Sequence, residues 1–292
     1  MKYLSLLLIT FFMSSCCSAK QLTNTSQNDI AQVTSIKNNA KIEDTTVTKT
    51  IPPFEEDDSK IIIRQETTPQ DMIGLVNSYV LNHTQWNTLL QKYVSDAGNV
   101  NYKGFKTDQK ALKNYIKFLA ENRPTADWTK EEKLAYWINA YNAMTIDLIV
   151  QNYPLSSIKD IKDPWDQRLW KLGDKWYNLN EIEHDILRKM DEPRIHFAIV
   201  CASFSCPKLQ NEAFTAINLE EQLTQAAKEF LADKNRNEIS QKSIKISKIF
   251  QWFSKDFKQN GSLIDFLNQY SDLQISPKAK KSYKDYNWDL NE

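Results

Sequence analysis

Side chains able to do chemistry are scarce in this chain, and they gather in one short stretch. The histidines are His83, His184 and His196, and beyond the first twenty residues the only cysteines are Cys201 and Cys206. His196 stands in an apolar segment that leads to Cys201, and small and hydroxyl residues separate the two cysteines. A thiol attacks well only as the thiolate, which a nearby histidine or positive charge favours. Residues 196–207 are therefore the first candidate for a reactive site.

Three kinds of chemistry fit these residues. In an oxidising compartment Cys201 and Cys206 form a disulfide, whose small loop contributes about 2 kcal/mol of stability. Alternatively, Cys206 or Cys201 is a nucleophile and His196 or His184 is its base. A metal site built from the same side chains is a third alternative, although their spacing matches no zinc pattern. We predict neither a metal nor a cofactor.

Further polar candidates flank this stretch. Arg188 lies one helical turn after His184 and shares its face. Asn139 and Asn142 are three residues apart on one face of an apolar segment. Asn142 could orient a histidine ring, as in Cys-His-Asn proteases, or both amides could bond the backbone. Arg188, Asn139, Ser203 and Ser205 are the candidate binding residues. The tryptophans serve either as core or as a platform for carbohydrate or peptide.

The elements that position these residues follow from apolar spacing and capping signals. A capping box of Thr129 and Glu132 opens the longest predicted helix, 130–152. The pair Asn180 and Glu183 predicts a cap for a helix from 181 to 190. Further helices are expected over 84–93, 108–122, 219–230 and 263–270, where apolar residues recur at helical spacing.

The remaining segments read as short strands. Gly173-Asp174 predicts a hairpin between 168–172 and 175–179. The apolar run 195–201 predicts a central strand, on which His196 and Cys201 would face opposite sides. Residues 244–246 and 286–290 alternate like strands. Because no βαβ rhythm appears, the sequence predicts a single mixed α+β domain, rich in helix, with a small and mostly antiparallel sheet.

The first residues indicate export. Lys2 precedes an apolar run of 11 residues, 3–13, which is too short to span a membrane. Ser14-Ser15-Cys16 resembles the cleavage site of a bacterial lipoprotein signal, so residues 1–15 are the predicted signal and Cys16 the lipid attachment site. Cys17 is a second candidate, and an ordinary cleaved signal is the alternative reading. The expected location is the cell envelope, with the protein anchored to a membrane outside the cytoplasm.

Composition divides the rest of the chain and excludes one class of partner. Residues 16–70 are polar and almost free of aromatics, which predicts a flexible tether before a globular domain at 71–292. Within the tether, Ile61-Ile62-Ile63 is an exception that reads as a short strand or a docking segment. Lys+Arg and Asp+Glu both number 37, so the formal net charge is zero. Such a balance gives no electrostatic footprint for nucleic acid. The expected partners are the membrane, through the lipid, and a peptide or cell-wall ligand.

Several motifs occur together in order along the chain. They are Trp137–Ala143, Ile182–His184 with Leu187-Arg188, Pro193–Pro207, Ser247–Phe257 and Tyr286–Asn291. Together they resemble the domain-of-unknown-function family 547, over about Trp86 to Asn291. The resemblance implies one compact domain that gathers the motifs. Two positions depart from it, since Ala202 stands where many members have Gly, and Asn287 where Asp is commoner.

Looser similarity of the long Asn-bearing helix and the Cys/His segment suggests papain-like or transglutaminase-like hydrolases. Two functions therefore stay open. The first is a non-catalytic binding or envelope-assembly domain, in which the cysteines are a structural disulfide. The second is a thiol-dependent hydrolase or acyl transferase acting on amide bonds in peptides or cell-wall material. Either way, we expect His184, His196, Arg188 and the cysteine turn to share one polar pocket.

Overall fold

The computed structural model of this chain describes residues 60–61 and 80–292. At its start β1 (Lys60–Ile61), which falls in the stretch predicted as a tether, pairs antiparallel with β2 (Val80–Leu81). The predicted signal, Cys16 and the rest of the predicted tether lie outside the described residues. Within the described part, no helix has the length and apolar character needed to cross a bilayer.

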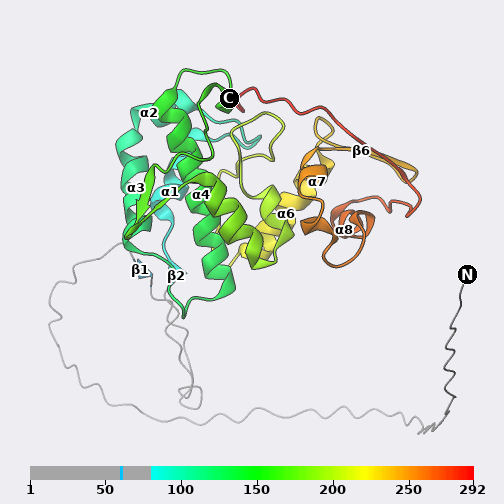
Figure 1. Cartoon of the computed structure of the whole chain (residues 1–292), viewed down its shortest axis with the longest axis horizontal. Helices are drawn as coiled ribbons and strands as arrows, with labels where there is room; N and C mark the ends of the chain where they lie inside the picture. The colour runs from blue at the N-terminus through cyan, green and yellow to red at the C-terminus, as the bar shows by residue number, and fades with distance from the viewer. Residues whose placement is uncertain (1–59, 62–79) are drawn as a thin grey trace, which may run out of the picture. The chain divides into compact units, whose positions relative to one another are not determined.

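Four helices form the first half of the domain (Figure 1). They are α1 (Thr84–Tyr93), α2 (Tyr102–Thr107), α3 (Gln109–Glu121) and α4 (Lys130–Asn152). The capping box that opens α4 is confirmed, because the Thr129 hydroxyl accepts from the Glu132 amide and the Glu132 carboxylate accepts from the Thr129 amide. Every residue from Leu134 to Val150 is buried, so α4 is the central helix and packs against α2 and α3.

The predicted hairpin follows a short helical turn, η1 (Ile158–Asp160), and is confirmed as β3 (Trp170–Leu172) and β4 (Lys175–Tyr177). Gly173 has a φ of +63°, which a residue without a Cβ adopts easily at the first turn position. The next segment is helical, as expected, but irregular. It runs through α5 (Leu179–Glu181), the π-helical η2 (Ile182–Ile186) and the 3-10 turn η3 (Leu187–Met190).

The cap predicted for that segment is wrong. Asn178, not Asn180, is the N-cap, and its side chain accepts from the Glu181 amide at 2.7 Å. Because the helical segment begins two residues earlier than predicted, Glu183 lies beyond its first turn. Its carboxylate is therefore not used in a cap and is available to other partners.

The central strand predicted over 195–201 is also wrong. Residues Pro193–Phe197 form a 3-10 helix, η4, whose first turn is held by the Glu192 carboxylate accepting from the Arg194 amide. Residues 194–200 are all buried. A segment that is buried on every side is apolar throughout whether it is a strand or a helical turn, so the apolar run does not distinguish the two. Proline at the first helical position favours the helical alternative.

The second half of the domain has its own aromatic core. It contains α6 (Leu219–Ala232), α7 (Ile249–Trp252), the 3-10 turn η5 (Asp256–Lys258) and α8 (Leu263–Tyr270). A three-stranded sheet has the order β5 (Glu238–Ile239), β6 (Ser243–Ile246), β7 (Lys280–Tyr283), and β6 and β7 run parallel. The rings packed at its centre are those of Phe197, Phe230, Phe250, Phe257 and Phe266.

The last residues form a strap instead of the predicted strand. Residues 286–291, which we call the C-terminal strap, make only isolated bridges, at Asp289 with Ser157 and at Leu290 with Ser203. In Figure 1 the red end of the chain returns from β7 to the neighbourhood of α2. There the Asn291 side chain accepts a hydrogen bond of 2.6 Å from the hydroxyl of Tyr102. The α+β class is confirmed, and the described residues form three small sheets in place of the one predicted.

Candidate functional site

The motifs of the second half of the sequence meet at one open pocket of about 350 Å³. α4, the 165–166 loop, α5, η2, η4, the 199–207 turn, α7 and the C-terminal strap contribute to its wall. The residues that line it are Tyr141, Trp165, Asp166, Asn180, Glu183, His184, His196, Ile199, Cys201, Cys206, Pro207, Ile249, Trp252, Phe253, Tyr286 and Trp288. The structure thus brings both candidate histidines and both candidate cysteines to a single cavity.

One wall of the pocket is a polar chain centred on Asp256. Arg188 donates to both carboxylate oxygens of Asp256, at 2.6 and 2.9 Å, and its third contact is a bond of 2.9 Å to His184 Nδ1. The Nε2 of His196 lies 2.8 Å from the same carboxylate. Phe253 stacks on the His196 ring with centroids 4.0 Å apart. The Asp256 carboxylate and the Phe253 ring therefore hold His196 in place, and Arg188 holds His184.

The hydrogen bonds fix how these groups are protonated. Burial alone would raise the pKa of Asp256, but its bonds from Arg188 and His196 outweigh burial and hold that pKa well below its usual range. An ionised carboxylate only accepts, so His196 donates from Nε2. Burial lowers the pKa of both histidines, and the nearby Arg188 charge lowers that of His184 further. Since Arg188 can only donate, neutral His184 carries its proton on Nε2.

Glu183 supplies a carboxyl group to the same pocket. Its Oε2 accepts a hydrogen bond of 3.0 Å from the Tyr141 hydroxyl of α4. Burial raises the pKa of Glu183 to about 7, although the bond from Tyr141 and the charge of Arg188 act against it. The group can therefore hold or release a proton near neutral pH.

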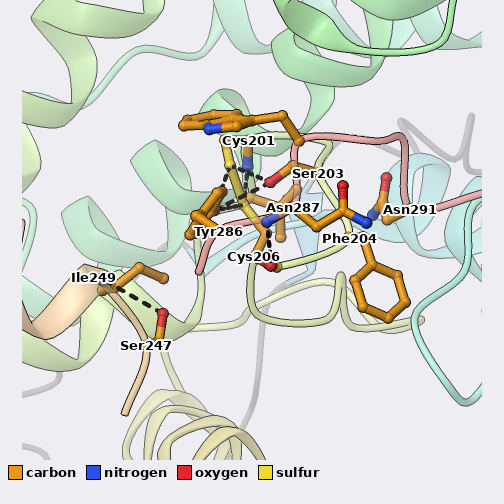
Figure 2. Close-up of a disulfide and its surroundings, with 12 residues drawn as sticks. Cys201, Ser203, Phe204, Cys206, Ser247, Ile249, Tyr286, Asn287 and Asn291 are labelled. Atoms are coloured by element: carbon orange, nitrogen blue, oxygen red, sulfur yellow. Dashed lines mark hydrogen bonds between the residues drawn. A yellow bond between two sulfur atoms is a disulfide. The ribbon is translucent and has the colours of Figure 1, made fainter. Parts of the chain in front are cut away.

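Another part of the wall is the Cys201–Cys206 disulfide, with Cα atoms 6.2 Å apart (Figure 2). The sequence left open whether these cysteines pair, and the structure has them paired. In this form neither sulfur is a thiolate, so neither can act as a nucleophile. The hydroxyl of Tyr286 lies 3.2 Å from Cys201 Sγ and 3.3 Å from Cys206 Sγ.

The turn that carries the disulfide is held by its neighbours. Ala202 has a φ of +57°, in the left-handed region that favours glycine, which accounts for the glycine common at this position in the resembling family. Arg236 donates to the carbonyl oxygen of Cys206 at 2.6 Å and to that of Phe204. The strap binds the turn by backbone bonds, from the Phe204 amide to Asp289 and from the Ser205 amide to Asn287.

An aromatic wall closes the pocket beside the disulfide. Trp252 packs on Tyr286 and Trp288, with centroids 4.8 and 6.0 Å apart, and Trp165 meets Trp288 edge-on at 5.8 Å. Trp252 is nevertheless 47% exposed. An exposed indole on the wall of an open cavity offers an apolar surface and an N–H donor to a ligand.

The two asparagines of α4 serve the backbone. Asn142 donates to the Ala198 carbonyl at 2.9 Å and accepts from the Val200 amide at 3.0 Å. Asn139 makes the same pair of bonds with Phe214, at 2.7 and 3.0 Å. Neither amide contacts a histidine among the described residues, and neither lines the pocket. In the part of the chain that the structure describes, the segment after η4 has no neighbouring strand to bond its backbone, and the Asn142 side chain supplies two of those hydrogen bonds instead.

The other predicted residues lie around the pocket or away from it. Ser203 is buried and donates to the Tyr286 hydroxyl at 3.1 Å, while the Ser205 hydroxyl accepts from the Asn287 amide at 2.8 Å. His83 is remote, buried beside Tyr115 at 2.7 Å. Within the described ranges no three His, Cys, Asp or Glu side chains are placed to hold a metal ion.

Sequence reasoning missed the residues that complete the site. Asp256 lies in the motif Ser247–Phe257 that resembles the family, but an acidic residue between the apolar Phe253 and Phe257 does not by itself show which partners it binds. The sequence places Glu183 in a capping pair with Asn180, and no local pattern marks Asp166. The spacing of the tryptophans along the chain does not show that Trp165, Trp252 and Trp288 pack together at the pocket.

These features define the class of the protein: an α+β domain with an aromatic pocket bounded by a disulfide and by a His–Asp–Arg cluster. Residues 125–231 match the model of the family described as "Protein of unknown function, DUF547". The resemblance read from the motifs is confirmed over those residues. No curated protein and no solved structure matches the chain.

Proposed function

We propose that this chain is a lipid-anchored protein of the cell envelope whose domain binds cell-wall material without catalysing a reaction. The observation that carries the proposal is the pocket itself. It offers an exposed tryptophan and several polar groups, while both of its sulfurs are consumed in a disulfide. A concave, mostly apolar site with a few convergent polar groups is the usual form of a ligand site.

The anchoring part of the proposal rests on the N-terminal residues. The short apolar run, the small residues Ser14 and Ser15, and Cys16 fit a lipoprotein signal. The diacyl group expected on such a cysteine gives stable membrane attachment, which a single acyl chain does not. The polar stretch that follows would let the domain reach material at a distance from the bilayer.

The binding part rests on groups at the pocket with unused hydrogen-bonding capacity. The side chains of Asp166 and Asn180 make no hydrogen bond to another described residue, and the Nε2 of His184 has no described partner either. Trp165 and Trp252 stand beside them. Acceptors, donors and flat apolar faces in one cavity suit the hydroxyl, amide and methyl groups that cell-wall fragments carry.

Sedimentation with insoluble peptidoglycan tests this proposal. Trp252→Ala should weaken binding by at least about tenfold, since a central tryptophan commonly dominates binding energy. Trp176→Ala is the matched control, because Trp176 is 50% exposed on β4 and does not line the pocket. Wild-type protein that stays in the supernatant, or an equal loss in both variants, would contradict the proposal.

A thiol-dependent hydrolase or acyl transferase acting on amide bonds is the second candidate. The observation that favours it is that His184 and His196 share the pocket with both cysteines. Such an enzyme needs the reduced pair. Alkylation of the native protein followed by peptide mapping counts the free thiols at Cys201 and Cys206. If neither cysteine reacts with the alkylating agent, the result supports the binding function. If both react, and alkylation abolishes cleavage of amide substrates, the hydrolase or acyl transferase function would take its place.

A further inference from the structure

We infer that the Cys201–Cys206 disulfide is a thiol–disulfide exchange site, where a thiol entering the pocket attacks Cys201 Sγ and Cys206 leaves as a thiolate. This inference does not depend on the ligand proposed above, because it concerns the reactivity of the sulfurs themselves. The structure distinguishes the two sulfurs by access and by hydrogen bonding. Both differences point in the same direction.

Access favours attack at Cys201. Both cysteines border the pocket, but Cys206 is only 3% exposed, whereas Cys201 is partly exposed. Exchange proceeds by attack of a thiolate on one sulfur, and its rate depends on which sulfur can be reached. A thiol in the pocket therefore meets Cys201 first.

Hydrogen bonding favours departure of Cys206. The Cys206 Sγ accepts from the Cys201 amide at 2.9 Å, and the Tyr286 hydroxyl lies within reach of both sulfurs, 3.3 Å from Cys206 Sγ and 3.2 Å from Cys201 Sγ (Figure 2). Ser203 donates its own proton to the Tyr286 oxygen, which leaves the phenol proton for sulfur. Burial raises the pKa of Tyr286 to about 12, so this hydroxyl stays a donor at neutral pH. The Tyr286 hydroxyl can donate to either sulfur, whereas the Cys201 amide donates to Cys206 Sγ, so a thiolate on Cys206 receives two hydrogen bonds when the disulfide opens.

A fixed positive charge stands beside the same residue. The guanidinium of Arg236 donates to the Cys206 carbonyl at 2.6 Å and to the Phe204 carbonyl. The same guanidinium also forms an ion pair with Asp233. A nearby cation lowers the pKa of a thiol, and a leaving thiol of lower pKa departs faster.

The exchange is balanced with a dithiol as the co-reactant. The thiolate of the dithiol forms a bond to Cys201 Sγ, the Cys201–Cys206 bond breaks, and its electron pair leaves on Cys206 Sγ. The second thiol of the dithiol then attacks the mixed disulfide at the dithiol's own sulfur and releases Cys201. Two electrons and two protons pass to the protein, which gains two thiols, and the dithiol becomes a disulfide.

Reduction would act on the pocket through the C-terminal strap. Tyr286 and Trp288 of the strap line the pocket. The strap binds the cysteine turn through Phe204 N to Asp289 O at 2.7 Å and Asn287 N to the Ser205 hydroxyl at 2.8 Å. A turn freed from its cross-link holds these bonds less firmly, so the aromatic wall is expected to loosen when the disulfide opens.

Mapping a trapped mixed disulfide tests the inference on the full chain. Native protein is treated with glutathione, quenched with acid and alkylated, and fragment ions between positions 201 and 206 locate each group. We expect glutathione on Cys201 and the alkyl group on Cys206. Glutathione mainly on Cys206, equal amounts on both sulfurs, or reduction only in denaturant would overturn the inference.

The rate of reduction by dithiothreitol tests the leaving-group argument. Tyr286→Phe removes one donor to Cys206 and should slow reduction about tenfold, the size of effect expected for a hydrogen bond to an anion. Tyr283→Phe is the matched control, since Tyr283 lies in β7 outside the pocket and should reduce within about twofold of wild type. Equal rates for Tyr286→Phe and wild type would exclude the Tyr286 hydroxyl as a stabiliser of the leaving thiolate.

Discussion

Arg188 donates two hydrogen bonds to the carboxylate of Asp256, at 2.6 and 2.9 Å, although 68 residues separate them in sequence. The pair joins η3 to η5, and the same carboxylate accepts from His196 of η4. The Asp256 and Arg188 side chains are only 13% and 27% exposed. One charge pair, with the bond from His196, thus connects the three short helical elements η3, η4 and η5 beside the pocket.

Asp256→Asn should lower the free energy of unfolding by about 2–3 kcal/mol at pH 7. A fully buried pair that loses one partner costs more, but this one is partly solvated. The amide cannot accept both guanidinium bonds and leaves the Arg188 charge uncompensated. Urea unfolding of wild type and variant measures the difference.

The same substitution has a pH signature with a defined sign. The pKa of Asp256 is depressed in the folded state, so its stabilisation is present above the ordinary aspartate pKa and is lost as the pH falls through the folded value. The gap between wild type and Asp256→Asn should therefore shrink below about pH 4. Asp185→Asn, which breaks an exposed pair with Lys189, should cost under about 0.5 kcal/mol. Equal costs at both positions would refute the assignment of Asp256 as the central group.

Asn142→Ala should destabilise the domain by about 3 kcal/mol. The substitution removes bonds to the Ala198 carbonyl and the Val200 amide, and it leaves two buried backbone groups unpaired. Asn152→Ala at the exposed end of the same helix removes one bond to Leu148 and should cost under about 1 kcal/mol. Thermal or urea unfolding compares the two. An Asn142→Ala protein as stable as the wild type would contradict the role of Asn142 as the backbone partner of Ala198 and Val200.

Local signals were enough to predict the elements that a few neighbouring residues determine. The capping box at Thr129 fixes the start of α4, and Gly173-Asp174 fixes the β3–β4 hairpin. The bounds predicted for the helix at 263–270 match α8, whose capping box is Ser262 with Asp265. In each case the deciding hydrogen bonds span two to four residues, so the sequence holds both partners within one window.

The remaining features depend on partners far away in sequence. The 195–201 run is buried on all sides, which gives no period from which to tell a strand from a 3-10 turn. Its backbone is completed by Asn142, 56 to 58 residues upstream. The strap alternates like a strand because one side of it faces the pocket and the cysteine turn, yet it finds only isolated bridges. The proximity of the histidines and cysteines was predicted, but Asp256 and Glu183 were not.

Cys16→Ser should abolish incorporation of labelled fatty acid and move the protein from the membrane to the soluble fraction. The reason is that the lipoprotein signal places the acceptor thiol directly after the small residues Ser14 and Ser15. Cys17→Ser is the control, and this variant should still incorporate labelled fatty acid and remain in the membrane fraction. Label retained in Cys16→Ser but lost in Cys17→Ser would move the anchor by one residue, and label in neither wild type nor variants would exclude lipidation.

Glu183→Gln should stabilise the domain by about 2 kcal/mol at pH 8 and change little at pH 4.5. Burial raises the pKa of Glu183 to about 7, above its usual value. A carboxyl with a raised pKa contributes its stability below the unfolded pKa, and that contribution is lost as the pH rises through 7. Glutamine has no proton to lose, so the stability of the variant should not fall across this window.

Glu181→Gln, two residues away, should change the free energy of unfolding in the opposite direction from Glu183→Gln. Burial would raise the pKa of Glu181, but its bonds to Lys175 and Arg168 outweigh burial and lower it. The charged form is the stabilising one there, so Glu181→Gln should weaken the domain by up to about 1 kcal/mol at pH 8. Unfolding free energies measured from pH 4.5 to 8 would separate the two variants. If Glu183→Gln also lost stability at pH 8, the Glu183 carboxylate would have to be charged and stabilised in the pocket, and the raised pKa of Glu183 would be ruled out.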